Sequence, residues 1–366
     1  MIDTASPAAD AVGSGATQIS CSRGFSEWLA AHAVSLALSS YQTGQLILIG
    51  RSPQGEVSFH RRDFQRAMGL WAEPGRLFVA ARQQIWRLEN VLAPGEVANS
   101  VFGTLYVPRA ADITGDLDIH EIGRDAQGRL IFVNTRYSCL ATVSATHAFQ
   151  PLWKPRFISR LAAEDRCHLN GLCLEAGHPR YVTAVARTDV VDGWRAHRAG
   201  GGVVIDVAEN TVVAEGLSMP HSPRLYRGEL YVLDSGRGML VRLDPRSGAR
   251  TEIAFCPGFL RGLSFHNGHA IVTLSLPRDS NFGGLPLQDA IAQRGGEPWC
   301  GVQIIDLASG DIVHWVRFEG AIRELFDVVA LPGILCPMGA PSQGPDFASV
   351  ITMEAPARDL DAPGWS

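Results

Sequence analysis

Lysine is almost missing from this sequence of 366 residues, because Lys154 is the only one and arginine supplies the other basic side chains. The formal net charge is -5, and no run of clustered basic residues accompanies it. Nucleic acids and anionic membranes both select clustered Lys and Arg, so neither is expected as a partner. Arginine binds carboxylates in a bidentate manner. A small-molecule substrate is therefore the expected partner, and the sequence gives no signal for an oligomeric state.

Paired cysteines and long apolar runs are missing too. The seven cysteines lie far apart and form no CxxC, which excludes a zinc knuckle and a disulfide framework. The first twenty residues have neither a basic nor an apolar stretch, so they do not form a secretory signal. No apolar run approaches the roughly 18 residues of a membrane-spanning helix. We expect a reduced, cytoplasmic protein with one domain over 23–350, between a disordered tail at 1–22 and a C-terminal tail at 351–366.

Several catalytic signatures are absent as well. The sequence contains no GxSxG, no P-loop and no GxGxxG after a strand. These absences exclude an α/β-hydrolase, a nucleotide triphosphatase and a Rossmann dehydrogenase. HExxH is also missing, so no close-spaced pair of metal ligands is present.

One long helix is expected near the N-terminus, over 23–41. Its apolar and aromatic residues lie near helical spacing: Phe25, Trp28, Leu29, His32, Ala33, Leu36 and Leu38. Ser22 or Ser26 is the expected N-cap. After this segment the chain changes to short β-rich runs between Gly, Pro, Asn and Asp turns, which is typical of a sandwich, barrel or propeller.

Six segments share one sequence pattern: an apolar strand, a Gly or Pro turn, and a second strand of high β propensity. They are 69–81, 121–134, 171–186, 224–235, 262–275 and 327–338. Several are followed by another hairpin, as in "VRLDPRSGARTEI". Two hairpins a period make a four-stranded propeller blade. We predict an all-β, six-bladed β-propeller with an N-terminal helix, closed by pairing of the strands at 45–50 and 56–60 with the last blade. A pair of β-sandwiches is the structural alternative.

The repeat brings distant polar residues together. The strands beginning the six periods are aligned on Leu70, Ile122, Leu172, Leu225, Leu263 and Val328. Two residues earlier stand Met68, His120, Asn170, Pro223, Arg261 and Phe326. Four residues earlier stand Arg66, Asp118, His168, His221, Phe259 and Glu324. Strand side chains alternate with period two, so both columns face the central funnel of a propeller.

These columns predict a histidine-rich site made of His120, His168 and His221, with Glu324 or Asp118. Imidazole and carboxylate groups are ligands of Zn(II), Fe(II) and Mn(II), so a divalent transition metal is one interpretation. The other interpretation uses the same residues as general acid and base, because imidazole titrates near neutral pH. Asn170 would orient the centre.

Further polar residues are candidates for binding substrate. Arg224 and Arg261 would hold a carboxylate or phosphate, or else form salt bridges between blades. Asn134, Arg136, Ser275 and Arg278 stand at the ends of second strands, where they line the funnel or cap its turns. Cys167 is expected to pack in the core, since adjacent strand residues point to opposite faces and it would not meet His168.

The chain resembles a bacterial family of conserved hypothetical proteins, some fused to tetratricopeptide repeats. The matching stretches are "IHEIGRDAQGRLIFVNTRYSCLATV", "DRCHLNGL", "MPHSPRLYRGELYVLDSG" and "GFLRGLSF". The resemblance covers about 24–340 and implies a propeller-like fold, without a function.

More distantly, the architecture is similar to six-bladed propeller enzymes of the gluconolactonase and strictosidine synthase type and to virginiamycin B lyase. Those enzymes place a divalent ion or a catalytic histidine in the central funnel. Their ion ligands are mainly Glu, Asn and Asp, whereas this chain offers histidine. The departure favours a transition metal or a metal-free acid–base site. Carotenoid oxygenases are similar in using several histidines for Fe(II), but they have seven blades.

The sequence therefore predicts a small-molecule enzyme that hydrolyses, eliminates from or isomerises an oxygenated anionic metabolite. A non-heme Fe(II) oxygenase is one alternative. A non-catalytic ligand-binding or scaffold propeller is the other.

Overall fold

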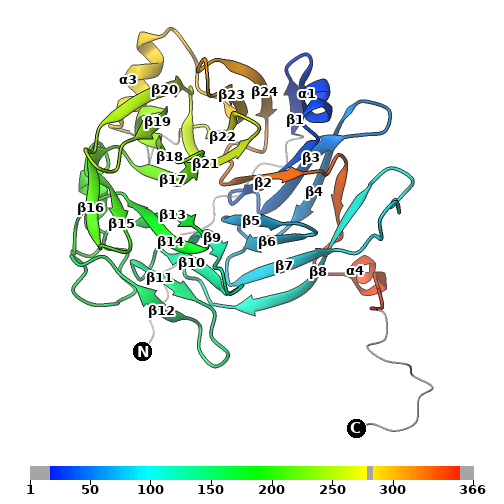
Figure 1. Cartoon of the computed structure of the whole chain (residues 1–366), viewed down its shortest axis with the longest axis horizontal. Helices are drawn as coiled ribbons and strands as arrows, with labels where there is room; N and C mark the ends of the chain where they lie inside the picture. The colour runs from blue at the N-terminus through cyan, green and yellow to red at the C-terminus, as the bar shows by residue number, and fades with distance from the viewer. Residues whose placement is uncertain (1–16, 278–282, 355–366) are drawn as a thin grey trace.

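Six antiparallel sheets radiate from one axis in the computed structural model, which describes residues 17–277 and 283–354 (Figure 1). Each sheet is a blade of four antiparallel strands, and two blades carry a fifth strand at their outer edge. The predicted six-bladed β-propeller is confirmed. We number the blades by the chain order of their innermost strands.

The strands of blades 1 to 3 follow one another along the chain. Blade 1 contains β5 (Leu70–Glu73), β6 (Arg76–Ala80), β7 (Gln84–Asn90) and β8 (Thr104–Ile113). Blade 2 contains β9 (Ile119–Arg124), β10 (Leu130–Asn134), β11 (Cys139–Thr142) and β12 (Gln150–Trp153). Blade 3 contains β13 (Leu169–Glu175), β14 (His178–Ala184), β15 (Gly202–Asp206) and β16 (Thr211–Leu217).

Blades 4 and 5 also take their four strands in chain order, whereas blade 6 takes its four strands from both ends of the chain. Blade 4 contains β17 (Pro220–Tyr226), β18 (Glu229–Asp234), β19 (Met239–Leu243) and β20 (Arg250–Phe255). Blade 5 contains β21 (Phe259–His266), β22 (His269–Ser275), β23 (Cys300–Asp306) and β24 (Ile312–Glu319). Blade 6 contains β25 (Val328–Pro332), β2 (Val34–Ser40), β3 (Gln45–Arg51) and β4 (Val57–Asp63).

The glycine turns of the repeat have a conformational reason. In blades 1 to 5 the turn between the first two strands holds a glycine with φ between 74° and 84°. Those residues are Gly75, Gly128, Gly177, Gly228 and Gly268. A left-handed backbone favours glycine because it has no Cβ. This requirement repeats the same sequence signal once per blade.

Ring closure follows the predicted scheme with one extension. β25 from the end of the chain pairs with β2, with Val328 opposite Leu38, and β3 and β4 complete the sheet. The expected pairing of 45–50 and 56–60 with the last blade is thus confirmed. The segment 327–338 does not form a second strand of this blade, because β26 (Pro337–Gly339) instead pairs in parallel with β8 of blade 1.

The long helix predicted over 23–41 is wrong in its second half. Helix α1 spans only Phe25–Ala31, Gly24 and not a serine precedes it, and Ala33 turns the chain with φ of 45°. All seven residues of β2 are buried. A strand buried on both faces has no polar alternation, so its apolar spacing was read as helical.

The remaining elements lie at the ends of the chain and in long connections. β1 (Gln18–Cys21) pairs with β24, so the expectation of a disordered tail over 1–22 is wrong at these residues, and 1–16 lie outside the described residues. Connections carry η1 (Gly193–His197), η2 (Ser235–Arg237) and α3 (Pro286–Gln293). α4 (Pro345–Ser349) comes before 351–354, which have no regular structure, and 355–366 also lie outside. No helix in the described part of the chain is long and apolar enough to cross a membrane.

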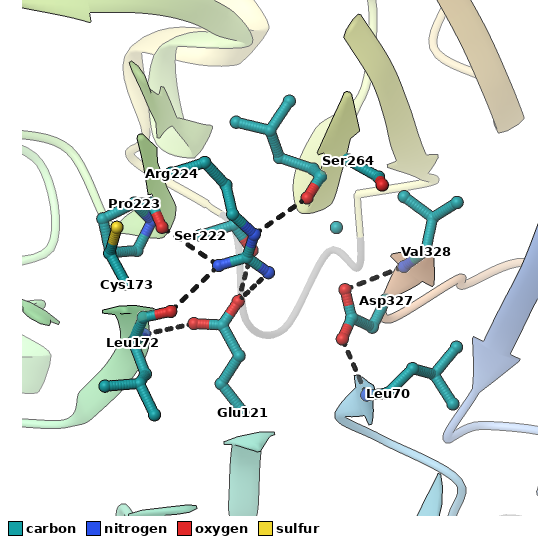
Figure 2. A network of polar contacts seen from close by, with 12 residues as sticks. Leu70, Glu121, Leu172, Cys173, Ser222, Pro223, Arg224, Ser264, Asp327 and Val328 are labelled. Atoms are coloured by element: carbon teal, nitrogen blue, oxygen red, sulfur yellow. Dashed lines mark hydrogen bonds and ion pairs between the residues drawn. The ribbon is translucent and has the colours of Figure 1, made fainter. Parts of the chain in front are cut away.

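The axis of the ring alternates between glycine and polar residues. In the observed register Pro223, and not Leu225, is the anchor of blade 4. The residues before the six anchors are Gly69, Glu121, Gly171, Ser222, Gly262 and Asp327 in blades 1 to 6. Each polar member bonds to the backbone of the next blade. Glu121 accepts the Leu172 amide, and Asp327 accepts the Leu70 amide at 2.8 Å (Figure 2). Ser222 donates to the Arg261 carbonyl at 2.6 Å. These bonds tie neighbouring blades together at the centre.

Candidate functional site

The funnel pocket opens at the end of the axis where the inner strands begin, and its volume is about 220 Å³. Residues of both predicted columns line it: Arg66, Met68, Asp118, His120, His168, Arg261 and Phe326. Met219, which precedes β17 and was in neither column, lines it too. Five more lining residues come from loops: Tyr41, Asp165, Trp194, Arg195 and Arg198. Several of them, including Asp118, Asp165 and His168, have positive φ of 42° to 55°. Backbone strain of this kind concentrates at functional sites.

The structure brings the three predicted histidines together. The ring centroids of His120 and His168 are 4.9 Å apart, and those of His120 and His221 are 6.4 Å apart. Asn170 joins them, since its Nδ2 donates to His221 Nε2 at 3.4 Å. Residues from three consecutive blades therefore meet as the propeller geometry predicts.

The register of blade 4 differs from the predicted one by two residues. His120 Nδ1 donates to the carbonyl two residues earlier at 2.9 Å, and His221 Nδ1 does the same to Met219 at 2.9 Å. His221 is therefore the counterpart of His120, not of His168. Pro223, and not Leu225, takes the anchor position. The prediction aligned on Leu225 because it is the more apolar residue of the pair.

His120 and His221 are buried and neutral. Burial lowers the pKa of His120 to about 4, with Asp118 acting against the shift. Burial and then Arg261 lower the pKa of His221 well below its ordinary value. Because each Nδ1 donates to a carbonyl, the Nε2 of each neutral ring is the unprotonated nitrogen.

His168 has a different partner from the other two. Its Nδ1 lies 2.8 Å from Asp165 Oδ2, three residues earlier. Its ring stacks on Trp194 with centroids 4.2 Å apart. A carboxylate on Nδ1 fixes the tautomer and leaves Nε2 to accept a proton. Among the three histidines, only His168 thus has a carboxylate within hydrogen-bond distance of Nδ1.

Arg261 carries a positive charge with no described carboxylate within ion-pair distance. Its guanidinium lies 5.0 Å from the Tyr41 ring, 5.2 Å from Phe259 and 5.0 Å from Phe326. No described residue accepts a hydrogen bond from it, and its Nε is buried without a partner. Aromatic faces hold such a cation without neutralising it. Arg261 can therefore bind an anion in the pocket.

Glu324 stands at the edge of the site and does not line the pocket. It is buried, and its Oε2 accepts a hydrogen bond from the Tyr41 hydroxyl. Tyr41 in turn lines the pocket beside Arg261. Glu324 thus reaches a ligand only through Tyr41.

Arg224 lies on the axis and not beside Arg261 in the pocket. Its guanidinium pairs with buried Glu121 and donates to the carbonyls of Leu172 and Leu263, at 3.1 Å each (Figure 2). All of these partners belong to other blades. Arg224 therefore forms a bridge between blades, which was the alternative to substrate binding.

The other predicted substrate residues act in turns and connections. Asn134 is fully buried and its Oδ1 accepts the Tyr137 amide at 3.1 Å, and Ser275 Oγ donates to Leu325 at 2.9 Å. Arg136 is largely exposed and lies 3.8 Å from Asp116. None of these three lines the pocket. Arg278 lies outside the described residues.

The described side chains do not form a metal centre. Within 17–277 and 283–354, no three His, Cys, Asp or Glu residues are placed to share one ion. Cys167 is buried as expected, and burial raises the pKa of its thiol to about 12. The described imidazoles are therefore placed to contact a ligand individually and not to share one ion.

Sequence reasoning missed Met219, because of the shifted register of blade 4, and four lining residues outside the columns: Tyr41, Asp165, Arg195 and Arg198. Three of them stand in connections outside the aligned strands, and Tyr41 follows β2 directly. Asp165 carried a usable signal, because it precedes His168 by three residues in a turn. Arg195 and Arg198 belong to the long insertion of blade 3, whose path the repeat does not determine.

Comparison with solved structures supports the fold. The crystal structure titled nidogen/laminin complex contains a chain with a TM-score of 0.51 and 11% sequence identity. The match covers 82% of this chain and 99% of the other. At this identity the likeness concerns the fold alone. No curated protein matches the chain.

A family profile described as "Domain of unknown function (DUF4915)" matches residues 23–339. That range begins just before α1 and ends with β26, so it contains all six blades and every described residue of the funnel pocket. The chain belongs to this family of propeller-fold domains.

Proposed function

We propose that the funnel pocket binds a small anionic metabolite and transfers a proton to or from it, with His168 as the base. The observation that carries the proposal is the convergence of three imidazoles, of which His120 and His168 line the pocket and only His168 has a carboxylate within hydrogen-bond distance. Hydrolysis, elimination and isomerisation all need such a transfer. In each, His168 Nε2 would take the proton while Asp165 stabilises the imidazolium.

The charge of the pocket supports an anionic ligand. Its described lining contains the arginines Arg66, Arg195, Arg198 and Arg261, against the carboxylates of Asp118 and Asp165. Arg66 is already paired with Asp118, and Arg195 lies 3.2 Å from Asp192. Arg261 is free of carboxylates among the described residues and is half-buried, which strengthens its attraction for an anion.

The size of the pocket supports a small ligand. Its volume of about 220 Å³ lies below the roughly 300–1,000 Å³ of sites for drug-sized molecules. Tyr41, Phe326 and Met68 supply apolar surface beside the charged groups. A compact metabolite with one acidic group fits this combination.

The metal interpretation receives less support than the acid–base one. A shared ion needs three or four ligands at about 2 Å, and the described side chains provide no such set. The Fe(II) oxygenase alternative needs the same ligands. Our proposal therefore routes no step through a metal.

The proposed setting is the cytoplasm. All seven cysteines are free thiols, and six of them are buried. Free thiols persist in a reducing compartment, where soluble anionic metabolites are available.

A ligand screen by thermal unfolding tests the proposal. Small carboxylates and phosphates would be added to the wild-type protein and to the Arg261→Gln and His168→Gln variants. Arg246→Gln, on a turn between β19 and β20, is the matched control for loss of one charge. A ligand present at 100 times its Kd raises stability by about 2.7 kcal/mol, which is a readily measured rise in Tm.

We expect at least one anion to stabilise the wild type and the control but not Arg261→Gln. His168→Gln should keep binding and lose turnover of that ligand. Binding that survives Arg261→Gln unchanged, or stabilisation by cations instead of anions, would contradict the proposal.

A further inference from the structure

The geometry assigns Trp194 as the positioning residue of the Asp165–His168 pair: its indole holds the imidazole by stacking and shares the Asp165 carboxylate oxygen with it. The inference rests on the proposed function only in taking His168 as the base. Trp194 would act through His168 and Asp165, so we do not call it catalytic.

Two contacts connect Trp194 to the pair. Its Nε1 donates to Asp165 Oδ2 at 2.9 Å, the same oxygen that lies 2.8 Å from His168 Nδ1. Its ring is inclined by 29° to the imidazole, with centroids 4.2 Å apart. The face of the Trp194 ring therefore restricts the imidazole, and its N–H edge restricts the carboxylate. A residue that only filled space would need neither the hydrogen bond nor the alignment.

The connection that carries Trp194 is fixed at three points. Arg166 Nη1 lies 2.6 Å from Asp189 Oδ1, before the indole in the chain. The Asp192 amide donates to the Glu164 carbonyl at 3.1 Å. Beyond η1, Ser218, in the connection between β16 and β17, donates to the Arg198 carbonyl at 3.0 Å. The insertion of blade 3 is thus held against the loop that contains Asp165, and the position of Trp194 is determined on both sides.

The hydrogen bond from Trp194 also reduces the negative charge that the Asp165 carboxylate presents to His168. Both described donors to Asp165 use Oδ2, while Oδ1 is buried and has no described partner. An N–H donor withdraws charge from a carboxylate and makes it a weaker partner for an imidazolium. Removing that donor should therefore raise the proton affinity of His168. Removing the carboxylate should lower it.

The same indole connects the pair to a cation. The Arg195 guanidinium lies 4.4 Å from the Trp194 ring centroid, and Arg195 also lines the pocket. Attraction of a cation to an aromatic face holds Arg195 in place. One side chain from the insertion thus sets the positions of both a base and an arginine at the pocket wall.

NMR titration of histidine in isotope-labelled protein tests the inference without a substrate. The His168 signal would be assigned by its loss in His168→Gln. In Trp194→Phe, which keeps an aromatic ring and removes the N–H, we expect the His168 pKa to rise by about one pH unit, or roughly tenfold in proton affinity. Asp165→Asn should lower it. Trp315→Phe, on exposed β24, is the control and should leave it unchanged.

The outcomes separate this inference from the proposed function. An unchanged His168 pKa in Trp194→Phe, with a clear fall in Asp165→Asn, would overturn the role of Trp194 and leave the anion pocket intact. Loss of anion binding in Arg261→Gln tests only the pocket. If Trp194→Phe is destabilised, a native chemical-shift pattern for His120 and His221 establishes that the titration reports on the folded site.

Discussion

The three funnel histidines differ in what binds Nδ1. A carbonyl oxygen accepts from His120 and from His221, whereas a carboxylate faces His168. A carbonyl carries no charge to offset protonation, and burial outweighs the effect of Asp118 on His120, so the first two rings stay neutral. The same residue type thus has two kinds of Nδ1 partner around the pocket.

The depressed pKa of His120 predicts a contribution to acid sensitivity. Its folded pKa is about 4, against about 6.5 for an unperturbed histidine, so the unfolded chain binds more protons between these values. This stability is present above pH 6.5 and is lost as the pH falls toward 4. The loss is on the order of 3 kcal/mol. Urea unfolding should show a shallower pH dependence for His120→Gln than for wild type in this window. Equal slopes would contradict a neutral buried His120.

The contacts of Arg224 predict that its substitution lowers the stability of the fold but does not weaken anion binding. Removing it would leave the Glu121 carboxylate buried without its ion partner. Breaking a buried pair in this way costs about 3–5 kcal/mol. Chemical unfolding of Arg224→Met should show that loss, while anion binding by the folded fraction should persist. Arg250→Met, on the outer strand β20, should be nearly neutral, and a comparable loss there would remove the special role of the axis pair.

Among the elements, the inner strands depend on their alternating glycines. A Cβ on Gly171 would lie 2.2 Å from Thr183 Oγ1 and 2.3 Å from Pro223 Cδ. Pro223 belongs to the neighbouring inner strand β17, so the close approach is between blades. Glycine here lets adjacent strands converge near the axis, and the polar residues of blades 2, 4 and 6 fill the space.

Gly171→Ala should therefore destabilise the ring. Overpacking of this kind costs about 1–3 kcal/mol, which a shift of the urea midpoint would report. Gly200→Ala is the matched control, because a Cβ there meets no atom within 4 Å and its φ is not in the left-handed region. A smaller loss of stability in Gly171→Ala than in Gly200→Ala would show that a Cβ fits between the inner strands.

At the scale of the whole molecule, the repeat made the fold and part of the site predictable. Glycine turns and apolar strands recur because every blade has the same local requirements. His120, His168 and Arg261 could be placed together from that recurrence. The β2 strand could not be recognised, since burial of all seven residues removes the alternation that marks a strand.

The rest of the site depends on features that do not repeat. Other inner strands have a bulge like the one between His221 and Arg224. In blade 4, however, Pro223 stands where the other blades have an aliphatic anchor, so the sequence pattern does not indicate the correct register. Arg195 and Arg198 reach the pocket from the long connection between β14 and β15 of blade 3. Insertions are placed by tertiary contacts such as that of Arg166 with Asp189, which local sequence does not encode.

Ring closure predicts how the whole chain responds to truncation. β25 is the inner strand of blade 6, and β2 pairs with it across almost 300 residues of sequence. A chain ending at 326 would lose β25, Asp327 and its bond to Leu70, leaving β2 as an open edge. We expect it to aggregate or to unfold without cooperativity. A chain ending at 344 loses only α4 and the contacts of Arg109 with Val350 and Thr352 among described elements, so it should keep the wild-type transition. Circular dichroism in urea, with size-exclusion chromatography, compares the two, and a cooperative monomer ending at 326 would refute closure by β25.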